Sequence, residues 1–156
     1  MWYEIDNPDK VIDDVSLEIA IKGDVNKRVF IIEGKSFCGK STFIKNIDCE
    51  RTLCVPANLI YETVFYTLDV RQNMEMILYF LTQLNLKILF IEDFDLSFAH
   101  GDATLELFAN IVLWLSKQYK VVLTGINISN DCRTFLDLLP DKNRHFKYTD
   151  RKSLEV

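Results

Sequence analysis

Residues 34–42 read Gly34-Lys35-Ser36-Phe37-Cys38-Gly39-Lys40-Ser41-Thr42 and match the pattern G-x-x-x-x-G-K-[ST] at every fixed position. The residues before them, Val29–Glu33, form an apolar, β-branched run that is typical of a buried strand. Phe43, Ile44 and Ile47 follow at helical spacing. A glycine-rich loop between a strand and a helix directs backbone N–H groups and the positive end of the helix dipole at an anion. The sequence therefore predicts a phosphate-binding loop in which residues 34–42 contact a nucleotide.

Two side chains of this loop have specific expected roles. Lys40 is expected to reach the β- and γ-phosphates, because this lysine is the fixed cation of the pattern. The Ser41 hydroxyl is expected to ligate magnesium, since the last fixed position is always a hydroxyl residue. The predicted cofactors are therefore ATP or ADP together with Mg²⁺.

The second informative stretch is Lys87-Ile88-Leu89-Phe90-Ile91-Glu92-Asp93, an apolar run that ends in two acids. This is the form of a Walker B strand, which delivers a carboxylate to the magnesium shell and often a second one that orients the attacking water. We expect Glu92 to ligate magnesium and Asp93 to orient water. A strand that simply ends in acids is the alternative, and the complete phosphate loop upstream favours the metal role.

Composition predicts one globular domain over residues 1–156. The chain has 49% hydrophobic and 26% charged residues, which are ordinary values for a soluble protein. It shows neither an apolar run of membrane-spanning length nor the pattern of a signal peptide, so we expect a cytoplasmic protein with no membrane contact. The net charge of −5 argues against direct DNA binding by this chain. The four cysteines lack C-x-x-C spacing and are expected to be reduced thiols rather than zinc ligands.

Strand and helix patterns alternate along the chain. Asn7-Pro8 is expected to open a helix with Ile12, Val15 and Ile19 on one face and Gly23 at its end. Further helices are expected over 57–66, from 69 with a core-facing stripe (Met74, Ile77, Leu78, Leu81 and Leu84), over 101–118 and from 129 to 140. Besides residues 29–33 and 87–93, strands are expected at 52–55, 120–125 and, at a sheet edge, 145–148. This alternation predicts a three-layer α/β/α fold of the P-loop NTPase type with a mainly parallel five-stranded sheet.

The order of these elements resembles the ATPase core of the AAA+ class, and within it the DnaA and Hda family of replication proteins. Four stretches carry the resemblance: Val55–Ile60, Leu89–Phe94, Gly101–Leu115 and Val122–Gly125. The last resembles the family's sensor strand, which makes Asn127 the candidate sensor although Ile126 stands where the family has an acid. Leu139 to Arg144 is similar to the segment that carries an arginine directed at a neighbour's nucleotide, which makes Arg144 the candidate.

The resemblance implies an AAA+ base domain that binds ATP or ADP and acts as a switch in the initiation or regulation of DNA replication. Its partner is expected to be a protein, either a replication initiator or a second copy of this chain. The family has Asp-Asp where this chain has Glu92-Asp93, so the position of the attacking water is open. The family's helical lid and helix-turn-helix domain find no counterpart in residues 1–156. The resemblance therefore implies slow or partner-dependent hydrolysis.

Two other functions fit the phosphate loop. A small P-loop kinase needs additional arginines that clamp its second substrate, and Arg51, Arg71 and Arg133 are scattered in the sequence. A non-hydrolysing interaction module would use the nucleotide only to complete its fold. The sequence by itself leaves both alternatives open.

Overall fold

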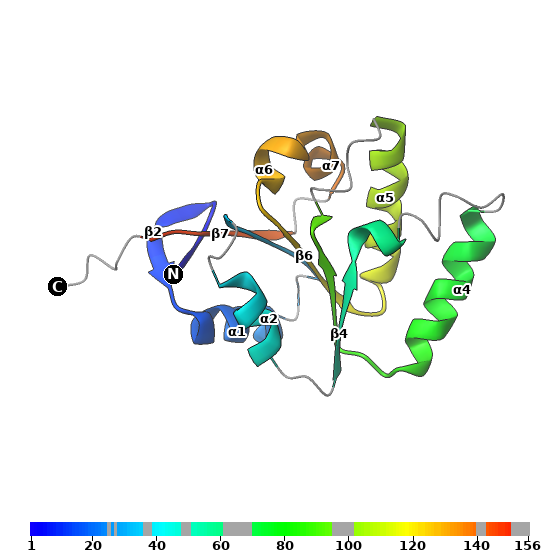
Figure 1. The fold of residues 1–156 in the computed structure, drawn as a ribbon, viewed down its shortest axis with the longest axis horizontal. Coiled ribbons are helices and arrows are strands. Elements are labelled where there is room, and N and C mark those ends of the chain that lie inside the picture. The colour runs from blue at the N-terminus through cyan, green and yellow to red at the C-terminus, as the bar shows by residue number, and fades with distance from the viewer. Residues whose placement is uncertain are drawn as a thin grey trace.

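The computed structural model of the chain describes residues 1–24, 26, 28–35, 39–47, 51–60, 70–94, 102–139 and 143–150. Its strands are β1 (Trp2–Glu4), β2 (Asn7–Ile12), β3 (Val29–Glu33), β4 (Thr52–Pro56), β5 (Ile88–Glu92), β6 (Lys120–Gly125) and β7 (Arg144–Tyr148). They form one seven-stranded sheet in the order β2-β1-β7-β3-β6-β5-β4 (Figure 1). The five strands from β7 to β4 are parallel, and β1 and β2 are antiparallel additions beside β7. The predicted five-stranded parallel sheet is thus confirmed, and an N-terminal hairpin extends it to seven strands.

Helices cover both faces of this sheet. The described helices are α1 (Asp14–Gly23), α2 (Lys40–Asn46), α4 (Val70–Gln83), α5 (Asp102–Leu115), α6 (Ile128–Asp131) and α7 (Arg133–Leu138), and residues 57–60 are also helical. Alternate residues of β3 enter different cores: Phe30 packs in the core with α1 and α2, and Ile31 in the core with α5 and α7. The protein is therefore the expected three-layer α/β/α fold (Figure 1).

The prediction for the first element was wrong. Asn7 and Pro8 begin strand β2 rather than a helix, and α1 starts only at Asp14. The outermost strand tolerates Pro8 because a proline without an N–H costs least at a sheet edge. The helix has its own N-cap, since Asp13 Oδ1 accepts a hydrogen bond from the backbone N–H of Ser16 at 2.8 Å. An Asx cap closer to the helix thus overrides the Asn-Pro signal.

The buried face of α1 also differs from the predicted one. Leu17 and Ile21 are fully buried, whereas Val15 and Ile19 are 64% and 65% exposed. The hairpin explains the change, because Trp2 is fully buried and its Nε1 donates to Asp14 Oδ1 at 2.7 Å, which fixes the rotation of the helix.

Two further predictions need correction. Strand β7 is not an edge strand, because it lies between β3 and β1. On α4 the expected core stripe is shorter than predicted: Leu81 is buried and Ile77 partly buried, but Leu84 is exposed. Leu84 follows Gln83, the last residue of α4, and so lies beyond the helix. The side chains of Met74 and Leu78 lie outside the described part of the structure.

None of the helices in the described ranges is long and apolar enough to cross a membrane.

Candidate nucleotide site

The phosphate loop begins where β3 ends, between β6 and β7. The backbone N–H of Gly34 donates to the carbonyl of Gly125 at 3.1 Å, which ties the first loop residue to the end of β6. Gly39 is the N-cap of α2 and has a φ of 102°, in the left-handed region. Ser36, Phe37 and Cys38 lie outside the described residues, as does the side chain of Ser41. The described ends of the loop have the strand–turn–helix context that the motif requires.

Lys40 lies at the first position of α2, and its side chain folds back over the loop. Its Nζ donates to the carbonyl oxygen of Gly34 and, at 3.3 Å, to that of Lys35. The ammonium group is thereby held over the start of the loop, with two backbone carbonyls among its acceptors. An entering phosphate group can replace these carbonyls as the acceptor, because a charged acceptor makes the stronger hydrogen bond.

The left-handed backbone at Gly39 yields a prediction. A Cβ at this position meets no atom within 4 Å, so an alanine would be resisted by the backbone conformation alone. Gly39→Ala is expected to lower the free energy of unfolding by about 1–2 kcal/mol, measured by urea denaturation. Gly23→Ala is the matched control, because Gly23 ends α1 in equally open space without a left-handed φ. It should be neutral or stabilising, and an equal loss in both variants would contradict the interpretation.

The two predicted acids end β5 at the same edge of the sheet as the loop. Glu92 is the last residue of β5, and only β6 separates this strand from β3. Asp93 follows with a φ of 55° and is exposed, whereas Phe94 is fully buried against Phe108 and Phe135. The left-handed turn thus turns the Asp93 carboxylate outward while the next side chain enters the core. Such a backbone conformation is uncommon outside glycine and is concentrated at functional sites.

Glu92 is half-buried and influences a neighbouring thiol. Burial, and after it the charge of Glu92, raise the pKa of Cys54 on the adjacent strand β4. Cys54 is therefore a protonated thiol at neutral pH. Glu92 ends β5, which lies two strands from β3, the strand that leads into the phosphate loop.

The sensor candidate lies at the same edge. Asn127 follows β6 and is the residue before α6, and β6 pairs with β3 so that Gly125 lies opposite Glu33. The Oδ1 of Asn127 accepts a hydrogen bond from Asn130 Nδ2 at 2.9 Å. The structure thus brings Asn127 to the loop edge, together with Lys40, Glu92 and Asp93.

A cluster beside the loop was missed by the sequence analysis. Glu33, directly before Gly34, is fully buried; its Oε1 lies 2.5 Å from His145 Nε2, and its Oε2 accepts from the backbone N–H of Ser129 at 3.1 Å. Burial acts to raise the pKa of Glu33, but the hydrogen bonds and charge of His145 and the bonds from Ser129 outweigh it and place the pKa below its ordinary value. Glu33 therefore joins β3, α6 and β7 directly beneath the loop. The sequence did offer one sign of this cluster, because Glu33 is an acid at the end of an apolar strand.

This cluster predicts a pH dependence of stability. A carboxylate whose pKa is lowered by folding stabilises the protein above its unfolded pKa, about 4.3 for Glu. That stabilisation should be lost as the pH falls from about 4.3 through the lower folded pKa of Glu33. We expect Glu33→Gln to flatten this acid part of the curve of unfolding free energy against pH, measured by urea denaturation. Glu106→Gln, on an exposed position of α5, is the control. Unchanged slopes in Glu33→Gln would contradict the assignment.

Arg144 is placed away from the loop. It is the first residue of β7 and lies opposite Phe30. The pair formed by Glu33 and Lys147, which is next to the loop, is three residues further along both strands. Its Nε and Nη2 donate to the two carboxylate oxygens of Glu4, each at 2.8 Å, and its Nη1 donates to Asp24 at 3.4 Å. The bond to Glu4 is the main reason why the pKa of Arg144 is raised. Within one chain Arg144 joins β7 to β1, and its action on a neighbour's nucleotide stays a prediction.

No protein-family model matches the sequence, and no curated protein matches it. Among solved structures, the chain is similar to AMPPCP-bound DnaA from Aquifex aeolicus, with a TM-score of 0.50 and 17% sequence identity. The likeness covers 85% of this chain and 43% of that one, so the chain spans less than half the length of the DnaA structure. This likeness is one of fold alone, and with the order of the parallel strands it is consistent with a three-layer α/β/α fold of the P-loop NTPase type.

Proposed function

We propose that this chain is a nucleotide-binding switch domain that takes ATP or ADP with Mg²⁺ in the loop at residues 34–42. The observation that carries the proposal is a shared location at the carboxyl ends of the parallel strands. There the Lys40 ammonium covers the loop after β3, and Glu92 and Asp93 stand at the end of β5, two strands away. In this proposal Lys40 binds the β- and γ-phosphates, Ser41 and Glu92 hold magnesium, and Asp93 orients water. Asn127 reports the state of the γ-phosphate.

The role of this switch, we further propose, is in the initiation or regulation of DNA replication through a protein partner. The support is the likeness in fold to DnaA together with the stretches that resemble its family. The partner is either a replication initiator or a second copy of the chain, and hydrolysis is slow unless that partner completes the site. The structure adds no support for the kinase alternative. Arg51 lies at the amino end of β4, whereas the phosphate loop lies at the carboxyl ends of the parallel strands.

The experiment that tests nucleotide binding is a thermal shift of the full chain with ATP or ADP, each with and without Mg²⁺. A ligand at a hundred times its dissociation constant should add about 2.7 kcal/mol to the free energy of unfolding. Mg²⁺ should strengthen the effect of ATP. A chain that shows no shift with either nucleotide, at millimolar concentration and with Mg²⁺, does not act as a nucleotide switch.

A further inference from the structure

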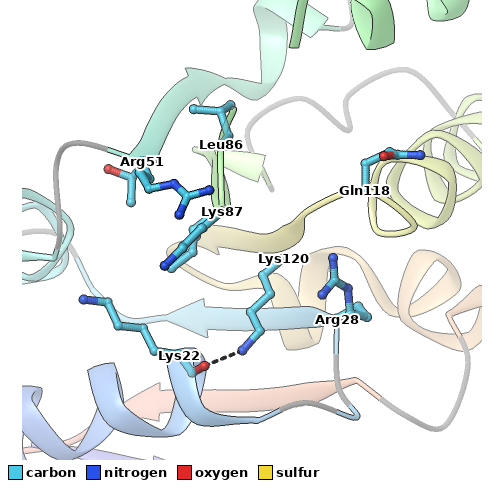
Figure 2. Close-up of a pocket in the computed structure, with 9 residues that line it drawn as sticks. Lys22, Arg28, Arg51, Leu86, Lys87, Gln118 and Lys120 are labelled. Atoms are coloured by element: carbon cyan, nitrogen blue, oxygen red, sulfur yellow. Dashed lines mark hydrogen bonds between the residues drawn. The ribbon is translucent and has the colours of Figure 1, made fainter. Parts of the chain in front are cut away.

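A cavity of about 420 Å³ lies at the edge of the sheet opposite the phosphate loop. Its lining contains five basic residues and, among the described residues, no acidic one: Lys22, Arg28, Arg51, Lys87 and Lys120, together with Thr52, Leu86, Ile88 and Gln118. Figure 2 shows these basic side chains around one space, with Arg51 and Lys87 on one side of it and Lys22 and Lys120 on another. In a chain of net charge −5, such a concentration of positive charge needs an explanation.

Four of the basic residues form a row across neighbouring strands. Arg28 precedes β3, Arg51 precedes β4, Lys87 precedes β5, and Lys120 begins β6. Backbone hydrogen bonds hold the row together: Lys87 N donates to Arg51 O at 2.8 Å and Lys120 N to Lys87 O at 3.1 Å. Val121 N donates to Arg28 O at 2.8 Å. Like charges on adjacent strands repel one another, so the row destabilises the sheet as long as no anion compensates it.

The side-chain partners of this row are mostly neutral. Arg28 Nε donates to Ser116 O at 3.0 Å, and Arg51 donates to the carbonyl and side-chain oxygens of Asn85 at 3.3 and 3.2 Å. Lys120 Nζ donates to the carbonyls of Ile21 and Lys22 at 2.5 and 2.8 Å. These bonds fix the side chains in place without cancelling their charge, and they leave further donors on each guanidinium.

Among the described residues, two carboxylates lie near the cavity, and each has a basic partner. Glu18 pairs with Lys22 at 3.1 Å along the exposed side of α1, and Asp24 accepts a hydrogen bond from Arg144. Burial, and then the charge of Arg28, lower the pKa of Lys120 against the opposing effect of Asp24. At Lys120 the charge of Arg28 therefore has a larger effect than the opposing charge of Asp24.

We propose that this cavity is a second anion site, which binds a compact small molecule with two or more adjacent phosphoryl groups. Its volume lies within the range of small-molecule pockets, roughly 300–1,000 Å³. Guanidinium groups bind phosphate through paired hydrogen bonds, and lysines add point charges. A compact ligand is favoured over a nucleic acid because a long polyanion also meets the net negative charge of the chain. Strand β3 separates this site from the phosphate loop by about 16 Å, so the inference does not rest on the proposed function.

Inorganic tripolyphosphate is the probe, titrated by calorimetry into the full-length Lys40→Ala variant so that the phosphate loop contributes little. We expect saturable binding, and Lys87→Gln in the same background should weaken it about tenfold or more, the loss of one charge-assisted contact. Lys10→Gln is the matched control, because it removes the same charge from exposed strand β2. Lys87→Arg keeps the charge and should restore most of the affinity.

A second readout separates a binding site from a structural cluster. Without ligand, Lys87→Gln should unfold at the same or a higher temperature than its parent, because it relieves repulsion in the row. If Lys87 were structural, the variant would instead be destabilised. The proposal is overturned by an absence of tripolyphosphate binding, by equal losses in Lys87→Gln and Lys10→Gln, or by tighter binding of single-stranded oligonucleotide than of tripolyphosphate.

Discussion

Lys40→Ala is expected to lower the affinity for ATP with Mg²⁺ roughly ten- to a hundredfold, because a hydrogen bond to a charged group contributes about 1.5–3 kcal/mol. The structure sharpens this expectation, since the Lys40 ammonium already lies over the start of the loop on two carbonyl acceptors. Isothermal titration calorimetry with ATP and Mg²⁺ measures the change. Urea denaturation without nucleotide should accompany it, because the variant also loses the bonds to Gly34 and Lys35.

The matched control for this variant is Lys35→Ala. Lys35 belongs to the same loop, is exposed and occupies a variable position of the motif, so only its backbone is used. It should retain most of the affinity. If both variants lost affinity equally, the effect would reflect the charge of the loop rather than a specific contact of Lys40.

Arg144→Ala is expected to remove partner-dependent ATP hydrolysis. The isolated chain should hydrolyse ATP very slowly, and its mixture with a full-length replication initiator should exceed the sum of the separate rates. A positioned arginine is worth about 10³–10⁵ in rate in related phosphoryl transfers. The structure adds a condition, because Arg144 must exchange Glu4 and Asp24 for the partner's nucleotide. Phosphate release by the separate proteins and the mixture measures the effect.

Glu4→Gln distinguishes the two possible roles of Arg144. This variant weakens the ion pair but keeps the arginine, so a mixture containing it should stay active or become faster. If Arg144 only joins β7 to β1, both variants should lose stability and neither should change the rate specifically. In the contrary outcome, the ATPase rate of the mixture equals the sum of the two separate rates, both with the wild-type chain and with Arg144→Ala. That result would remove the support for a replication partner.

The parallel core could be read from the sequence because its signals are local. Continuous apolar runs such as Phe30–Ile32 and Leu89–Ile91 are buried on both faces and fall between clear helix patterns. The hairpin was missed for the opposite reason. Strand β1 has only three residues, and β2 is mostly exposed, so neither shows the hydrophobic alternation that identifies a strand. Its stability comes from tertiary contacts such as the burial of Trp2.

The candidate site divides in the same way. Loop residues 34–42 and the pair Glu92 and Asp93 are contiguous motifs, so the sequence alone is enough to propose them as candidates. The pair of Glu33 and His145 joins residues 112 positions apart, and the basic row joins four separate strands. Only the strand order brings such residues together, and a single sequence does not contain it.

The two outer strands of the described sheet, β2 and β4, each carry a proline, Pro8 and Pro56. A proline lacks the backbone N–H that an incoming strand needs as a donor. Pro8 interrupts the row of donors within β2, whereas Pro56 stands at the end of β4 and limits how far a ladder on that side could continue. Addition of a further strand is therefore disfavoured beside β2 and is limited in length beside β4, so a protein that docks on this molecule is expected to recognise mainly its side chains.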